Sequence, residues 1–367
     1  MTGLPRRGSS GTALDLPSVV AGRVSVVIPA YNCAATVAAA VESCLVQHCG
    51  DLEVLVVNDG STDRTAEILA GFGARLRVIH QQNAGLAAAR NAGQRAATGE
   101  FIAWMDGDDL MAPERLELEV SVLKANPEIG VVSSEFSAFL DPAANVDESY
   151  GATYYAAFGR VGGAEALYPQ LEAPLMSGGR AVRVRSGAIH DLLVWGNFVH
   201  PPTVLARRSI LEASGFADES LKYSSDYDLI LRMARRARFA YIEAPLLRYR
   251  LSSSQMSHVN AGERMQLETA HILERVGIED PEAAVRLKQV LRLRVAESYI
   301  YAADAIGNEN RGRALRLLLR GLKTGVVFRP AARALARIIV PAAMVPGIKR
   351  LRHAIPIRRG SGVTAKG

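Results

Sequence analysis

The stretch FIAWMDGDDL, residues 101–110, decides the fold. Its apolar half, Phe101 to Met105, predicts a short strand buried on both faces, as in a parallel sheet covered by helices. Three carboxylates follow within four positions, in Asp106-Gly107-Asp108-Asp109. Because such neighbouring charges repel one another, the cluster is stable only beside a positive group, and carboxylate oxygens facing a diphosphate suit Mg²⁺ or Mn²⁺. The alternative is a polar turn that caps a helix opening at Pro113.

The same alternation of strand and helix extends on both sides of this stretch. Short apolar runs predict strands at 24–28, 52–57, 76–79, 101–105 and 129–133, with helices between them at 33–47, 63–71 and 86–97. Pro29 is expected to end the first strand because it has no backbone N–H, and Thr62 to cap the second helix. This spacing indicates an α/β fold with a mostly parallel, Rossmann-like sheet flanked by helices.

The rest of the chain is less regular at first. Residues 141–196 show no clear period, which predicts loops and short helices over the sheet. A strand at 203–206, helices at 208–214 and 226–237 and an extended run at 239–249 follow. A C-terminal helical extension is predicted at 261–276, 282–303 and 310–322, after which Pro330, Pro341 and Pro346 are expected to leave only short pieces.

Polar residues follow three of the predicted strands, and ligands of such sheets bind beyond the carboxyl ends of the strands. We therefore expect Pro29-Ala30-Tyr31-Asn32, Asn58-Asp59-Gly60-Ser61 and the acidic cluster on one rim. Tyr31 suits stacking on a base, or is an ordinary loop aromatic. Asp59 suits hydrogen bonds from a base or ribose, or forms an Asx turn before a helix.

Further along, Asn83-Ala84-Gly85 and Arg90-Asn91-Ala92-Gly93 gather amides and a guanidinium near a helix N-terminus. They form an anion environment, or a helix surface whose small residues pack on the sheet. Asp226 and Asp228 begin a later helix, where an N-cap role is adequate. Facing the pocket of Asp108, Asp226 would instead take a proton from an acceptor hydroxyl. His200 stands alone, and a structural role is favoured.

Composition narrows the class of protein. The chain has 367 residues and a net charge of +6, but residues 311–367 hold fourteen Lys or Arg and no acidic residue. The sequence contains no run of about 18 apolar residues, and it therefore predicts no membrane-spanning helix. Cys33, Cys44 and Cys49 are too few and too clustered for a disulfide framework. The absence of a Walker A motif, of G-x-G-x-x-G after a strand and of G-x-S-x-G disfavours P-loop ATPases, dinucleotide dehydrogenases and α/β-hydrolases.

Taken together and in this order, five segments resemble family 2 glycosyltransferases with the GT-A fold. They are 24–32, 57–63, 83–85 with 89–93, 106–109 and 226–229, and the resemblance covers about residues 22–250. It implies a nucleotide-sugar donor, a divalent metal (Mn²⁺ or Mg²⁺) and inversion at the anomeric carbon. The family's acidic residue before the catalytic Asp is here Ser225, so Asp228 stays open as the alternative to Asp226.

Residue roles are carried over from the same resemblance. Asp226 would be the catalytic base, and Asp108, with Asp106, would bind the metal. The residues that would bind the nucleotide-sugar are Pro29, Ala30, Tyr31, Asp59, Asn83, Gly85, Arg90, Asp106 and Gly107.

The expected organisation is a flexible leader at 1–21, a glycosyltransferase domain at 22–255, a helical region at 256–325 and a basic amphipathic tail at 326–367. The donor half of the domain is expected at about 22–135 and the acceptor half at 136–255.

The expected reaction transfers a sugar, from a UDP-sugar by default, to a glycan or lipid-linked hydroxyl in cell-surface polysaccharide or glycoconjugate synthesis. The alternatives are a nucleotidyltransferase and an inactive nucleotide-sugar-binding protein. No nucleic-acid partner is expected, and the expected location is the cytoplasm.

The basic end has its own interpretation. Apolar residues and arginines mix in residues 327–359, which is typical of a segment lying on an anionic membrane surface. Such a location, on the inner face of the cell membrane, would suit an acceptor carried by a polyprenyl lipid. The alternative is a solvated or self-packing helical tail.

Overall fold

The computed structural model describes residues 16–141, 144–252, 262–325 and 327–339. Its first four long strands form the parallel half of a large sheet, in the order β3 (Arg77–Gln81), β2 (Leu52–Asp59), β1 (Val20–Ala30) and β4 (Gly99–Trp104). This half holds the strand ends that carry the predicted polar loops. The predicted α/β fold with a mostly parallel sheet is confirmed.

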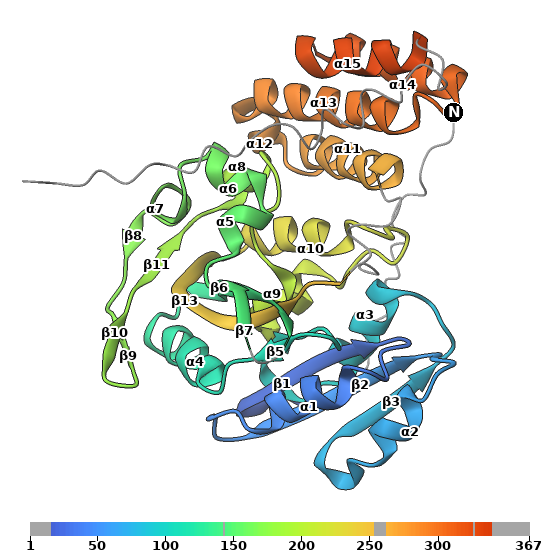
Figure 1. The fold of residues 1–367 in the computed structure, drawn as a ribbon. Coiled ribbons are helices and arrows are strands. Elements are labelled where there is room, and N and C mark those ends of the chain that lie inside the picture. Colours follow the sequence, from blue (N-terminus) through green and yellow to red (C-terminus); the bar gives the residue numbers. More distant parts are fainter. Residues whose placement is uncertain (1–15, 142–143, 253–261, 326, 340–367) are drawn as a thin grey trace, which may run out of the picture. The chain divides into compact units, whose positions relative to one another are not determined.

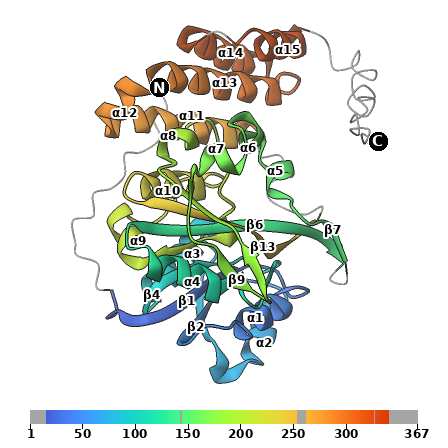
Figure 2. The same ribbon diagram turned by 90° about the vertical axis from the view of Figure 1, so that its left-hand side faces the viewer.

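The other half of the sheet is mixed. β12 (Leu205–Arg207) lies antiparallel between β4 and β6 (Ile129–Asp141), and β6 runs parallel to β13 (Arg238–Arg250). Figure 2 shows β6 and β13 side by side along their length. Smaller strands complete this half: β5 (Leu110–Met111), β7 (Ala144–Asp147), β8 (Gln170–Leu171) and β11 (Val184–Gly187). β9 (Leu175–Ser177) and β10 (Arg180–Val182) pair separately.

Helices cover both faces of the parallel half (Figure 1). α3 (Leu86–Ala96) packs on one face so closely that a Cβ at Gly93 would lie 2.4 Å from Val27 Cγ1. α1 (Val37–Leu45) and α2 (Thr65–Ala70) cover the other face. Because both faces are covered, the strands consist almost entirely of apolar residues.

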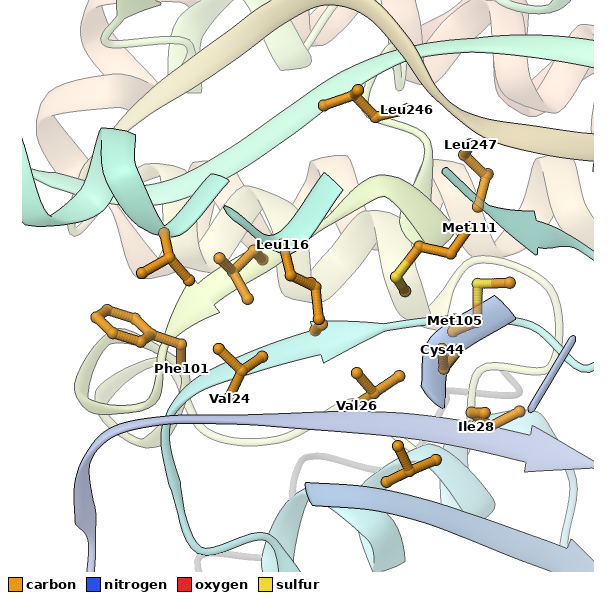
Figure 3. Close-up of a cluster of buried hydrophobic side chains, with 14 of the residues drawn as sticks. Val24, Val26, Ile28, Cys44, Phe101, Met105, Met111, Leu116, Leu246 and Leu247 are labelled. Atoms are coloured by element: carbon orange, nitrogen blue, oxygen red, sulfur yellow. The ribbon is translucent and has the colours of Figure 1, made fainter. Parts of the chain in front are cut away.

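The main core lies between the sheet and its helices. Figure 3 shows Val24, Val26 and Ile28 of β1 facing Cys44 of α1 and Leu116 of α4 (Arg115–Ala125). Alternate residues of β1 point to this side, as the period of a strand requires. The core therefore fixes the direction in which β1 delivers the loop after Ala30.

Residues 141–196 contain short helices, as their irregular sequence predicts. They are α5 (Gly151–Tyr154), α6 (Ala156–Arg160), α7 (Ala164–Leu167) and α8 (His190–Leu193). The helices predicted at 208–214 and 226–237 are α9 (Arg208–Ser214) and α10 (Ser225–Ala234). The strands β7 to β11 were not predicted there, because strands of two to four residues carry too little periodic signal.

The chain divides into two compact units, one built from Met1–Ala261 with Pro281–Val290 and the other from Gly262–Asp280 with Leu291–Gly367. α12 (Pro281–Arg286) belongs to the first unit. The second contains α11 (Gly262–Glu279), most of α13 (Lys288–Ile306), α14 (Arg311–Thr324) and α15 (Phe328–Ile339). α13 runs antiparallel to α11, since Gly262 faces Ala305 and Gly277 faces Leu291.

Four local predictions differ from the structure. β1 continues through Pro29, because β1 pairs there with β2 alone and needs no donor toward β4. Thr62 does not cap α2; Asp63 Oδ1 accepts instead from Thr65 N. α15 continues through Pro330, which lies in its first turn, where the missing N–H has no intrahelical acceptor. β1 already begins at Val20, inside the expected leader.

Some expectations lie outside the described residues. They concern residues 1–15 of the leader, the boundary expected at 255/256, and residues 340–367 of the basic tail. Residues 327–339 of that tail are described, as α15.

Candidate active site

Two loops at the carboxyl ends of β1 and β2 are bound to each other. Asn32 N donates to Ser61 Oγ at 3.1 Å, and Thr62 N donates to Asn32 Oδ1 at 2.8 Å. Asn32 has φ 48°, a left-handed conformation that asparagine tolerates better than most residues. Pro29 and Ala30 are buried, whereas Tyr31 is 52% exposed. Of these predicted donor-binding residues, Tyr31 has its ring open to a ligand.

Asp59 is buried at the end of β2, and its carboxylate is used within the protein. Oδ1 accepts from Gln81 Nε2 at 2.7 Å and from Ala84 N at 2.8 Å. Oδ2 accepts from Gly85 N at 2.9 Å, at the N-cap of α3. Asp59 therefore holds the predicted segment 83–85 in place beside the strand end.

Close backbone approach fixes the same segment from the other side. Gly60 has φ 70°, and a Cβ at Gly60 would lie 2.7 Å from Asn83 N. The turn after β2 and the start of α3 thus fit together only with glycine at position 60. The Asn83 side chain remains exposed at this edge.

Arg90 on α3 forms an ion pair with the first carboxylate of the acidic cluster. Its Nη2 lies 2.9 Å from Asp106 Oδ1, and the side chains are 3% and 31% exposed respectively. The guanidinium also lies over the Trp104 ring, 5.4 Å from its centroid, which is a favourable cation–π arrangement. The anion that Arg90 binds is thus supplied by the chain itself.

The remaining two carboxyl groups of the cluster, Asp108 and Asp109, lie on the loop between β4 and β5, where burial disfavours their charged forms. Burial, and then the charge of Asp106, raise the pKa of Asp108 to about 6. Asp109 is fully buried, and burial raises its pKa well above the ordinary range, with Asp108 and Asp106 adding to the effect. Arg250 fixes the loop by donating from its N to Asp109 Oδ1 at 2.9 Å and from Nε to the Asp108 carbonyl at 2.7 Å.

The acidic loop also packs against the loop after β1. Thr36 Oγ1 donates to the Gly107 carbonyl at 2.8 Å. A Cβ at Gly107 would lie 3.2 Å from Cys33 Sγ and 3.4 Å from the Pro29 carbonyl oxygen. Three sequence-predicted loops therefore meet at one edge of the parallel sheet.

This acidic loop fits a divalent cation. Two carboxyl groups, Asp106 and Asp108, stand two positions apart, and the charge of Asp106 adds to the effect of burial in raising the pKa of Asp108. Over the described ranges, no three His, Cys, Asp or Glu side chains form a metal-binding group. A cation here would need further oxygen ligands from water or from a bound diphosphate, as is usual for Mg²⁺.

Asp226 lies half-buried in the first turn of α10. Loss of hydration raises its pKa, the positive charge of Arg90 offsets part of this rise, and the negative charge of Asp106 adds to it. These effects place Asp226 within electrostatic range of the Arg90–Asp106 pair. The acidic cluster after β4 and the start of α10 therefore influence each other electrostatically.

Asp228 has a different environment from Asp226. Its Oδ2 accepts from Arg232 Nη2 at 2.7 Å and from Nε at 3.0 Å, one helical turn away. Arg232 also donates to the carbonyls of Ser214, Gly215 and Phe216, so this buried pair ties α10 to the end of α9.

Two positioning contacts were missed by sequence reasoning. Asn91 Nδ2 donates to the Ala217 carbonyl at 2.9 Å, and Ala217 N donates to Asn91 Oδ1 at 2.9 Å, which holds the loop that leads to α10. Arg115, fully buried beside Glu119, donates to the Pro202 carbonyl at 2.5 Å. The Asn91–Ala217 and Arg115–Pro202 contacts each join residues more than 80 positions apart, and no local sequence pattern indicates such contacts.

An aromatic cluster near Asp226 was also missed. Tyr155 Oη lies 3.0 Å from His200 Nδ1, and the His200 ring stacks on Phe136 with centroids 4.0 Å apart. Burial lowers the pKa of His200 to about 3, so the imidazole is neutral. Burial above all raises the pKa of Tyr155, and nearby charges that include Asp226 and Asp106 add to this rise. The structural role favoured for His200 is thus realised beside the site.

Comparison with known families bears on this arrangement. Residues 25–156, which carry the loops after β1, β2 and β4, match the sequence model of Glycosyl transferase family 2. This part of the chain is similar to that family. The predicted relationship to family 2 glycosyltransferases is therefore confirmed.

Relatives with curated descriptions align with this protein over different lengths of the chain. An uncharacterized glycosyltransferase of Rickettsia typhi is 28% identical over 236 residues, which span 64% of this chain and 66% of that protein. Uncharacterized glycosyltransferase EpsJ of Bacillus subtilis is 44% identical over 92 residues, 24% of this chain and 27% of that protein. The chondroitin synthase of Pasteurella multocida is 45% identical over 98 residues, 26% of this chain and 10% of that protein. The matches thus span less than two thirds of these relatives.

Solved structures of similar fold support the GT-A architecture. Residues 1–349 of Staphylococcus aureus TarS, solved in complex with UDP-GlcNAc, align with a TM-score of 0.57 and 17% identity over 86% of this chain and 88% of that one. Mannosyltransferase PcManGT of Pyrobaculum calidifontis, solved with GDP-Man and Mn²⁺, aligns with a TM-score of 0.50 and 21% identity over 89% of this chain and 82% of that one. In the part of the chain that the structure describes, every helix is too short or too polar to cross a bilayer.

Proposed function

We propose that this protein is an inverting glycosyltransferase that moves a sugar from a nucleoside-diphosphate donor to a hydroxyl group. The proposal is supported by the electrostatic interaction of Asp226, at the start of α10, with Arg90 and Asp106, which pair with each other at 2.9 Å. A carboxylate with a raised pKa beside an acidic, cation-fitting loop is the arrangement that a general base and a diphosphate leaving group require.

The donor is proposed to bind across the loops after β1 and β2. Tyr31, exposed at the rim, would stack on the base, and Pro29 and Ala30 would shape the wall beneath it. Asp59 is engaged by Gln81 and the 83–85 segment, so it would act mainly by holding Asn83 and Gly85 at the ribose side. UDP is the proposed nucleotide, in keeping with the UDP-GlcNAc complex of TarS.

Asp108, with Asp106, would hold Mn²⁺ or Mg²⁺ beside the donor diphosphate. When bound, such an ion offsets the negative charge that develops on the leaving diphosphate. Arg90 orients Asp106 through their 2.9 Å contact, and Thr36 holds the Gly107 carbonyl so that both carboxylates stay on one short loop. The Mn²⁺ reported with PcManGT supports this choice of ion.

Asp226 would accept the proton of the acceptor hydroxyl. Attack by that hydroxyl from the face opposite the leaving diphosphate gives inversion at the anomeric carbon. Asp228 is occupied by Arg232 on α10, and this supports Asp226 as the base. Asn91 would keep Asp226 in place by holding Ala217 in the preceding loop.

The acceptor is proposed to be a glycan or a polyprenyl-linked glycan in cell-surface polysaccharide or glycoconjugate synthesis. Relatives described as chondroitin synthase and hyaluronan synthase support a polysaccharide context. The proposed location is cytoplasmic, on the inner face of the cell membrane, with contact expected within residues 327–359.

The test is to supply UDP-, GDP- and dTDP-sugars with Mn²⁺ and lipid-extracted or soluble glycan acceptors, and to measure both possible products. We expect nucleoside diphosphate to be released with no pyrophosphate. Release of pyrophosphate from a sugar phosphate and a nucleoside triphosphate would assign a nucleotidyltransferase instead. Donor binding with no product from any pair would indicate an inactive binding protein.

A further inference from the structure

The second unit presents an apolar band on its α14–α15 side. Of the fifteen large hydrophobic side chains exposed in the described residues, six lie on these two helices. They are Leu315, Leu319 and Leu322 on α14 and Phe328, Leu335 and Ile339 on α15. Exposed apolar side chains scattered singly need no explanation, but a cluster of this kind on two adjacent helices marks an interaction surface.

The apolar band lies beside the buried core of the second unit, as the geometry of the two helices requires. Ala314 and Leu318 of α14 pack with Ala334 and Ile338 of α15. Leu315, Leu319, Leu322, Leu335 and Ile339 each directly follow a buried position, which turns them about 100° from the core-facing line of the helix. The two rows therefore run along one flank of their helices.

The opposite flank of each helix turns inward. Arg313 and Arg320 of α14 pair with Glu263 and Glu274 of α11. Arg333 and Arg337 of α15 pair with Asp304 of α13 in the same way. Since an arginine that reaches back to α11 or α13 precedes four of the five core positions of these helices, the hydrophobic residue that follows each of those positions faces away from α11 and α13.

Basic side chains border the apolar band. Arg316 and Lys323 on α14 and Arg329 on α15 lie one step further around their helices, on the outer edge of each row. None of the three forms an ion pair with the residues that the structure describes. Residues 311–339 hold eight Lys or Arg and no Asp or Glu. Long basic side chains can bury their stems beside apolar groups while their charges reach outward.

We propose that the α14–α15 band docks on the surface of an anionic lipid bilayer. Apolar side chains would enter the boundary between headgroups and acyl chains, and Arg316, Lys323 and Arg329 would meet the negative headgroups. The net positive charge of this segment favours anionic lipid over a second copy of the same surface, because two such faces would repel each other. The assignment includes α14, outside the 327–359 segment, and does not depend on the transferase activity.

The test is co-flotation of the full-length protein with phosphatidylcholine vesicles, prepared with or without phosphatidylglycerol. We expect flotation with the anionic vesicles and little with the neutral ones. The double substitution Leu319→Asp with Leu335→Asp should lower the partition coefficient by at least about tenfold, because burial of one leucine is worth about that factor or more. Ile278→Asp is the matched control, since Ile278 is 77% exposed on α11, away from the band.

Each variant is first compared with the wild type by circular dichroism and thermal unfolding, and the charge substitutions Arg316→Glu with Lys323→Glu form a second, independent set. These charge substitutions should weaken flotation with anionic vesicles while leaving UDP binding unchanged. Equal flotation with neutral vesicles, undiminished flotation of the leucine variant, or no flotation of the wild type would overturn the lipid assignment. A concentration-dependent dimer that the leucine variant loses, without flotation, would assign the face to a second copy.

Discussion

Arg90 Nη2 lies 2.9 Å from Asp106 Oδ1, and this contact connects α3 with the acidic loop at the end of β4. The next residue, Asn91, binds the Ala217 backbone in the loop before Asp226. Two consecutive residues of one helix therefore position both acidic segments of the site. The distance between the metal-fitting loop and the proposed base depends on α3.

Replacing Arg90 tests this dependence. Arg90→Lys keeps a positive charge but loses the planar guanidinium that lies over Trp104. Because a displacement of about 1 Å at a reacting group can cost roughly 10²-fold in rate, we expect a loss of turnover of that order. Arg64→Lys, on an exposed pair, is the control and should leave turnover unchanged. Wild-type kinetics in Arg90→Lys would show that Arg90 does not position the reacting groups.

Asp226→Asn should abolish most turnover and keep donor binding. General-base assistance is typically worth about 10²–10⁴ in rate, so kcat should fall by that factor. The amide is nearly isosteric, and it cannot accept the hydroxyl proton. Steady-state kinetics and UDP calorimetry on the same preparation measure the two quantities, and near-normal turnover would transfer the base to another group.

The neighbouring acid should behave differently. Asp228→Asn removes the buried carboxylate that pairs with Arg232, and breaking a largely buried pair by one partner costs about 3 kcal/mol of the free energy of unfolding. Urea denaturation followed by circular dichroism measures this loss. Unchanged stability together with lost turnover would reverse the roles assigned to Asp226 and Asp228.

The pH dependence follows from the raised pKa of Asp226. As the pH falls through this raised pKa, Asp226 gains a proton and can no longer accept one, so kcat should fall at a higher pH than an ordinary aspartate would give. The same shift has a stability consequence: a carboxyl whose pKa is higher in the folded than in the unfolded state destabilises the protein as the pH rises between the two values. Asp226→Asn should therefore unfold at a higher temperature than the wild type at neutral pH, and a lower one would contradict the shift.

Asn91→Ala should loosen the loop before α10. The buried N–H and carbonyl of Ala217 would lose their partner, at a cost of about 1–3 kcal/mol in the free energy of unfolding. Because the donor loops lie elsewhere, kcat should fall more than donor affinity. A variant with reduced stability and unchanged kcat would show that Asn91 supports the fold alone.

Much of the parallel half could be predicted because its signals are local. The strands that become β1, β2 and β4 are continuous apolar runs, and the polar clusters after them appear in the sequence itself. Local signals were insufficient at Pro29, because the strand pairing there leaves no need for a backbone N–H. They were also insufficient at Thr62 and Asp63, where two neighbouring residues could each cap the helix.

The residues that hold the loops of the site in position could not be predicted in the same way. Asn91 binds a backbone 126 positions away, and Arg115 reaches the Pro202 carbonyl across 87 positions. Such pairings depend on how α3 and α4 pack on the sheet, which periodicity does not encode. Asp59 had the right position, but its partners Ala84 and Gly85 were visible only in three dimensions.

The most direct test of the account is calorimetry of UDP binding, with GDP and dTDP in parallel, to the wild type, Asp108→Ala and Asp226→Asn, each with and without Mn²⁺. The account predicts nucleotide binding that requires Mn²⁺ in the wild type, persists in Asp226→Asn and is lost in Asp108→Ala. Metal-independent binding, or equal binding by Asp108→Ala and the wild type, would contradict it.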